Sequence, residues 1–79
     1  MQDPIVQALQ SANELKSGGQ YELAIRIYSE VLGDQPGNGE ALINRGECLL
    51  LDGKPALALP DLEKVLMILI IYRGHVYLC

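Results

Sequence analysis

The sequence is poor in the residues on which several functions depend. Its 79 residues contain six lysines and arginines against ten aspartates and glutamates, which gives a net charge of −4 at pH 7. Nucleic-acid-binding proteins gain affinity from clustered cations that displace counterions from the phosphates, so we expect no nucleic-acid partner. One histidine and two cysteines show no spacing typical of a metal site. We therefore expect neither a metal nor another cofactor.

Two cysteines are also too few for a disulfide framework, and the chain has no Asn-x-Ser/Thr sequon. The first residues, Met1-Gln2-Asp3-Pro4, lack the basic and apolar regions of a secretory signal, so we expect them to belong to the mature chain. The longest uninterrupted apolar stretch, Val65 to Tyr72, is far shorter than the roughly 20 residues that cross a bilayer. These absences favour a cytoplasmic protein without a membrane span.

Catalytic residues are equally scarce. Cys48 and His75 are the candidate nucleophile and base, but Cys48 has no activating cation nearby in the sequence and neither residue lies in a known signature. The glycines at 33, 37 and 39 have no Lys-Ser/Thr pair after them, so they indicate a turn and not a phosphate-binding loop. We therefore expect no enzymatic activity.

The composition is that of a folded domain. Hydrophobic residues make up 49% of the chain and charged residues 20%, close to ordinary globular usage. At this length the chain forms one small domain, residues 1–79.

The chain repeats itself at a spacing of 34 residues. Each copy contains two stretches of helical periodicity around a glycine, which predicts a helical hairpin. The residue pairs identical under this shift are Leu15 and Leu49, Gly19 and Gly53, Leu23 and Leu57, Ala24 and Ala58, Val31 and Val65, and Leu32 and Leu66.

Four helices are expected, over residues 4–17, 20–32, 39–51 and 55–72. Asp3 and Asn38 can cap the free amides at the starts of the first and third helices. Glycine tolerates the left-handed conformation at a helix end, so the glycines at 19 and 53 mark the two hairpin turns. Pro60 predicts a kink in the fourth helix, and we expect disorder or a strand after Gly74.

These residues resemble the tetratricopeptide repeat (TPR), a 34-residue helical hairpin whose helices cross at small side chains. The resemblance implies an all-α fold of two tandem TPR hairpins, a short right-handed α-solenoid. Repeat 1 covers about residues 5–38, repeat 2 about 39–72, and a C-terminal tail 73–79. Three departures are Pro55, at the place of Tyr21, Pro60 inside the last helix, and the absence of a closing proline after Leu66. The residues at the family's signature positions are Ala12, Leu15, Gly19, Tyr21, Ala24, Tyr28, Val31 and Pro36 in the first copy and Leu42, Gly46, Leu49, Gly53, Ala58, Leu62 and Val65 in the second.

In this family the first helix of each repeat lines a concave groove that holds a peptide or a helix of another protein. The resemblance therefore implies a non-catalytic adaptor or scaffold. By position, the groove residues are Val6, Leu9, Gln10, Asn13, Lys16, Glu40, Ile43, Asn44, Glu47 and Leu51.

A co-chaperone role is a more specific version of this expectation. Asn13 and Asn44 match the asparagines with which some family members clamp the acidic tails of heat-shock chaperones, but Leu9 stands at the place of the matching cation. The run Leu59 to Val65 resembles a stretch of luminal J-domain co-chaperones, which hold unfolded clients. The endoplasmic reticulum lumen is therefore an alternative compartment.

The apolar run near the C-terminus predicts a second kind of surface. A helix over residues 65–72 is apolar all round, which is typical of burial on more than one side. The alternative function is therefore structural self-association into a homo-oligomer. The same run is also consistent with a chain that continues into further structure, or with a β-strand and aggregation. The residues expected to drive self-association are Met67, Ile68, Leu69, Ile70, Ile71 and Tyr72.

Overall fold

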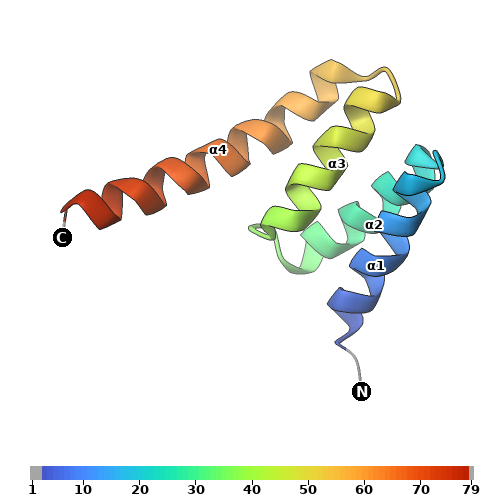
Figure 1. Ribbon diagram of the computed structural model, residues 1–79, viewed down its shortest axis with the longest axis horizontal. Helices are drawn as coiled ribbons and strands as arrows, with labels where there is room; N and C mark the ends of the chain where they lie inside the picture. Colours follow the sequence, from blue (N-terminus) through green and yellow to red (C-terminus); the bar gives the residue numbers. More distant parts are fainter. Residues whose placement is uncertain (1–2, 79) are drawn as a thin grey trace.

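The computed structural model describes the backbone of residues 3–78 and the side chains of residues 3–71. The chain forms four helices, α1 (Pro4–Ser17), α2 (Tyr21–Asp34), α3 (Gly39–Leu51) and α4 (Pro55–Leu78), and no strand occurs in this range (Figure 1). Each helix packs against the next along the chain, and α1 also contacts α3. The expected all-α fold of helical hairpins is confirmed.

Side-chain caps begin the first helix of each hairpin. Oδ1 of Asp3 accepts a hydrogen bond from the amide of Ile5 at 2.8 Å, and Oδ1 of Asn38 accepts one from the amide of Ala41 at 2.9 Å. These bonds satisfy amides that have no partner inside the helix. Both caps lie where the sequence predicts them.

The turns of the two hairpins have the same geometry. Gly19 and Gly53 both have a φ of 80°. In each turn the glycine amide donates to the carbonyl three residues back at 3.1 Å, and the next amide donates to the carbonyl five residues back at 2.8 Å. This pair of bonds is the Schellman motif, which satisfies the last carbonyls of a helix. The 34-residue repeat of the sequence is thus a repeat of backbone structure at the turns.

Small residues bring the helices of each hairpin together. Ala12, Ala24 and Ala58 have no exposed surface. Gly46 is buried, and a Cβ atom at this position would lie 2.9 Å from Cδ2 of Leu62, so α3 and α4 approach closely here. The core of the molecule consists of Leu9, Ala12, Ala24, Tyr28, Val31, Leu32, Ala41, Leu42 and Cys48.

The last helix is longer than the sequence predicts. It does not end near Tyr72, and the disorder or strand expected after Gly74 is wrong, because α4 continues to Leu78 and runs on both sides of Pro60. One glycine in a helix costs only about 1 kcal/mol relative to alanine, and no proline follows Pro60. Residues 73–78 are therefore part of a helix and not a separate tail.

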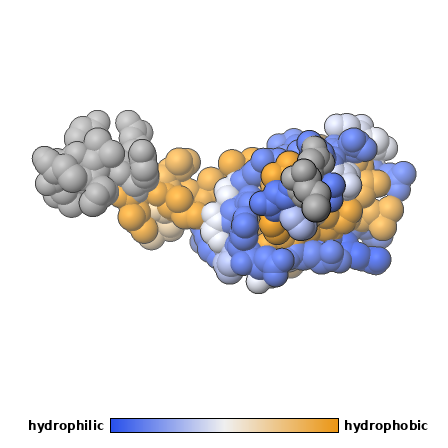
Figure 2. Space-filling view, turned by 90° about the horizontal axis from the view of Figure 1, so that it is seen from below, coloured by the Kyte–Doolittle hydropathy of each residue, from blue (hydrophilic) through white to orange (hydrophobic). Residues whose placement is uncertain are grey.

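The length of α4 makes half of it project from the body. The helix has 24 residues, whereas α3, its packing neighbour, has 13. At a rise of about 1.5 Å per residue, α3 can cover little more than half of α4. Figure 1 shows the second half of α4 extending away from the other three helices, and Figure 2 shows hydrophobic side chains where this arm leaves the body.

We expect Gly53→Ala to lower the free energy of unfolding by about 1–2 kcal/mol, because an alanine side chain clashes with the backbone in the left-handed conformation. Gly19→Ala should lose a similar amount, since its turn has the same φ. Urea unfolding measures both values. Gly37→Ala is the control, because its Cβ would meet nothing within 4 Å and its φ is not positive. Equal stability of Gly53→Ala and Gly37→Ala would contradict the role of this turn.

Candidate functional site

The predicted groove corresponds to a surface that α1 and α3 share, which we call the α1/α3 face. Its exposed large apolar residues are Val6 on α1, with 44% of its surface exposed, and Ile43 and Leu51 on α3, with 45% and 55% exposed. Gln10, Glu40 and Glu47 are exposed, and Asn13, Lys16 and Asn44 are half-buried.

Leu9 is the exception among the ten predicted groove residues. It is only 8% exposed and belongs to the core. Leu9 and Ala12 are three residues apart, so they share one side of α1, and that side packs inward. The surface therefore has less apolar area on α1 than the sequence suggests.

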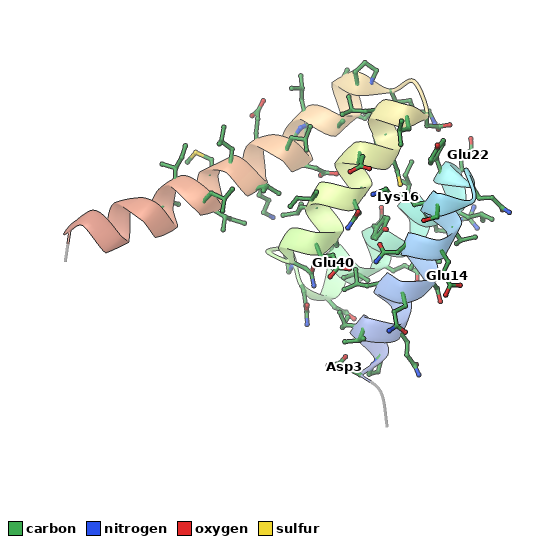
Figure 3. All side chains as sticks on the ribbon, viewed as in Figure 1. Asp3, Glu14, Lys16, Glu22 and Glu40 are labelled. Atoms are coloured by element: carbon green, nitrogen blue, oxygen red, sulfur yellow. The ribbon has the colours of Figure 1, made fainter. Side chains whose placement is uncertain are left out.

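Polar contacts join α1 to α3 across this face. Nδ2 of Asn13 donates to Oε2 of Glu40 at 3.1 Å. Nζ of Lys16 donates to Oδ1 of Asn44 at 2.7 Å and forms an ion pair with Oε1 of Glu47 at 2.9 Å. Figure 3 labels Lys16 and Glu40 on their helices. Five of the ten predicted groove residues are thus brought together, and they already bind one another.

Tyr28 adds a hydrogen bond to this network from the core. It comes from α2, it is fully buried, and its hydroxyl donates a hydrogen bond to Oδ1 of Asn13. Burial of the phenol, together with the negative charges of Cys48 in its thiolate form, Glu40 and Glu47, raises the pKa of Tyr28 to about 12. The hydroxyl therefore keeps its proton, and the amide of Asn13 has a partner on each end.

The face carries more negative than positive charge. Glu40 and Glu47 are exposed on α3, whereas Lys16 is already paired with Glu47. A clamp for an acidic tail needs free cationic donors to offset the desolvation of the carboxylates. The arrangement of charges does not supply them.

Cys48 is a buried thiol. It has no exposed surface, and burial raises its pKa, with Glu47 and Asp52 adding to the effect and Lys16 opposing it. A thiol with a raised pKa is a poor nucleophile. The side chain of His75, its predicted base, lies outside the described residues, so the expected lack of enzymatic activity stays a prediction.

Neither a membrane span nor a metal site is found in the described part of the chain. Among residues 3–78, no helix is both long enough and apolar enough to cross a membrane. Among the side chains of residues 3–71, no three His, Cys, Asp or Glu residues are grouped in a way that could hold a metal ion.

The sequence interpretation misses a buried ion pair between α3 and α4. Nε and Nη2 of Arg45 donate to the two carboxylate oxygens of Asp61 at 2.6 and 2.5 Å, and Nη1 donates to Oγ of Ser29 on α2 at 3.1 Å. The side chain of Asp61 is 6% exposed and that of Arg45 25%. The hydrogen bonds with Asp61 raise the pKa of Arg45.

A signal for this pair was present in the sequence. Arg45 lies three residues after Leu42 and four before Leu49, on the apolar side of its helix, and Asp61 has the same relation to Ala58 and Val65. Opposite charges on the apolar sides of neighbouring helices predict a buried pair. The pair borders a shallow cavity of about 370 Å³ that α2, α3 and α4 line together. Through Arg45, the pair connects α2, α3 and α4.

No family model, no curated protein and no solved structure matches the chain.

We expect Arg45→Ala to lower the free energy of unfolding by about 3 kcal/mol, because it leaves the Asp61 carboxylate buried without a partner. Arg45→Lys should recover only part of this loss, since an ammonium group cannot donate two parallel bonds to the carboxylate. Urea unfolding of both variants, with the exposed Arg26→Ala as the control, measures the effect. A loss no greater than that of Arg26→Ala would show that the pair does not hold the helices together.

Tyr28→Phe should change how stability depends on alkaline pH. The tyrosine pKa is about 12 in the folded chain, above the ordinary 10.0, so below pH 10 both states keep the proton. As the pH rises from about 10 to 12 the unfolded chain ionises first, and stability falls. The wild type should therefore lose more stability than Tyr28→Phe over this window, as thermal unfolding can measure. Parallel curves for the two proteins would contradict the assigned pKa.

Proposed function

We propose that this chain is a non-catalytic protein-interaction module of two TPR repeats, whose α1/α3 face binds a peptide or a helix of another protein. Two features support the family. The hairpin turns have identical φ values and hydrogen bonds at a spacing of 34 residues. Ala24 and Ala58, at equivalent positions, both have no exposed surface.

The observation that carries the proposal is the combination of apolar and fixed polar side chains on one surface. Val6, Ile43 and Leu51 are exposed large apolar residues at or beside a row of amides and charges. The apolar residues can supply burial, and the polar ones can bind the peptide backbone. Because Asn13 and Lys16 are already held by contacts with α3, binding costs less side-chain entropy.

The charges favour a partner that carries lysine or arginine next to apolar residues. Glu40 and Glu47 remain exposed although each has one contact, so each can take a further donor. An acidic tail would instead meet these carboxylates and a lysine that is already paired. We therefore do not propose a clamp for acidic chaperone tails. The few cysteines and the lack of sequons support a cytoplasmic setting.

Two synthetic peptides of equal length test this proposal, one alternating leucine with lysine and one alternating leucine with glutamate. We expect the lysine peptide to bind at least about tenfold more tightly at low salt, because like charges disfavour the other. It should shift the NMR amide signals of α1 and α3. The variant Glu40→Gln with Glu47→Gln should lose most of this preference.

The matched control is Glu22→Gln with Glu30→Gln, which changes the net charge equally at exposed positions of α2. This control should keep the preference for the lysine peptide. Equal binding of the two peptides, or equal effects of the two double variants, would show that the α1/α3 face does not select its partner by charge.

A further inference from the structure

Five leucines form a second apolar surface, which we call the leucine face. Leu59, Leu66 and Leu69 of α4 are 56%, 57% and 54% exposed, and Leu50 of α3 is 47% exposed. Leu62, which contacts Gly46, is half-buried between them. Residues 59, 62, 66 and 69 recur at alternating steps of three and four, so they form one row along α4.

The row continues beyond the end of the body. Leu50 is four residues after Gly46, so it lies on the side of α3 that faces Leu62. The part of the row near Leu59 therefore has α3 beside it. The part near Leu69 lies on the projecting half of α4, where no other described helix covers it (Figures 1 and 2). The row of leucines thus has α3 beside it along the first half of α4 and is uncovered along the second half.

We propose that two copies of this chain pair through the leucine face, with the α4 helices antiparallel. In this arrangement the projecting half of each α4 lies against the α3/α4 surface of the other copy. The same contact is made twice, as a two-fold symmetric interface requires. The argument for this pairing does not rest on the proposed peptide binding at the α1/α3 face.

Charge complementarity selects both the partner and its direction. Residues 65–72 carry no charge, and Glu63 and Arg73 stand five residues on either side of Ile68. Glu63 lies beside the row, four residues after Leu59, and Arg73 occupies a helix position seven after Leu66, which continues the row. In an antiparallel pair centred near Ile68, Glu63 of each copy is level with Arg73 of the other. A parallel pair would instead place like charges at both levels.

The shape of the chain favours the same direction. The body packs against the first half of α4 only. Antiparallel helices place the two bodies at opposite ends of the interface, whereas parallel helices would bring both bodies to one end. Each antiparallel contact also buries leucines against both α3 and α4, which adds area beyond that of two isolated helices.

Sedimentation of the full chain at micromolar concentration tests the pairing. We expect a dimer, and we expect Leu69→Glu to raise its dissociation constant at least about thirtyfold, because it buries a charge in the centre of the interface. The control is Ile71→Glu, which introduces the same charge two residues away. Ile71 is 64% exposed on the side of α4 away from the row, so this variant should remain a dimer.

Several outcomes would overturn the proposal. A wild-type chain that is monomeric throughout the micromolar range excludes the pairing. Equal disruption by Leu69→Glu and Ile71→Glu would mean that the helix associates through its general apolarity. Assemblies that grow beyond a dimer with concentration would indicate open aggregation. Circular dichroism of each variant establishes that its helices remain folded, and Leu66→Glu provides a second disruption of the same row.

A disulfide experiment tests the direction. In a background without the native cysteines (Cys48→Ala with Cys79→Ser), a mixture of Glu63→Cys and Arg73→Cys chains should give mainly the mixed disulfide on oxidation. A parallel pair would give mainly the two like disulfides, which would overturn the antiparallel arrangement. If Cys48→Ala unfolds the chain, Cys48→Val provides a larger apolar replacement for the buried thiol.

Discussion

The close approach of neighbouring helices at small side chains is the constraint on which the other features depend. Ala12, Ala24 and Ala58 have no exposed surface, and Leu62 occupies the space that a side chain at Gly46 would need. Since packing at these points is tight, a larger residue would force the helices apart. The approach also brings α1 beside α3, and this contact creates the α1/α3 face with Tyr28 beneath it.

Burial gives the two ion pairs that join described helices different roles. Asp61 is almost fully buried and accepts two of the three hydrogen bonds that Arg45 donates, whereas Glu47, the partner of Lys16, has a half-exposed side chain. A surface pair contributes little to stability, but breaking a buried pair is costly. Arg45 and Asp61 therefore fix the relative positions of α2, α3 and α4. Lys16 and Glu47 shape the charge that an incoming peptide meets.

Local signals in the sequence predict most of the helix boundaries. Asp3, Asn38, Gly19 and Gly53 act through hydrogen bonds to residues at most five positions away, so their effect is visible in a short stretch of sequence. The end of α4 is different, because Gly74 gives a weak stop signal that the helix overrides. Side-chain partners such as those of Asn13 depend on which helices become neighbours, and periodicity alone does not specify them. The burial of Leu9 follows from the same tertiary packing.

The difference in length between α3 and α4 separates the two proposed binding surfaces. A helix of 13 residues cannot cover one of 24, so the apolar row of α4 is left open along its second half. On α3, Leu50 lies about 120° around the helix from Asn44 but only about 60° from Glu47 and about 20° from Ile43, given the roughly 100° between successive residues. Pairing through the leucine face would therefore cover the Ile43 edge of the α1/α3 face and leave its Asn44 side accessible. A dimer would then present two such faces at once, and a partner with two binding segments would gain affinity from their linkage without any new contact.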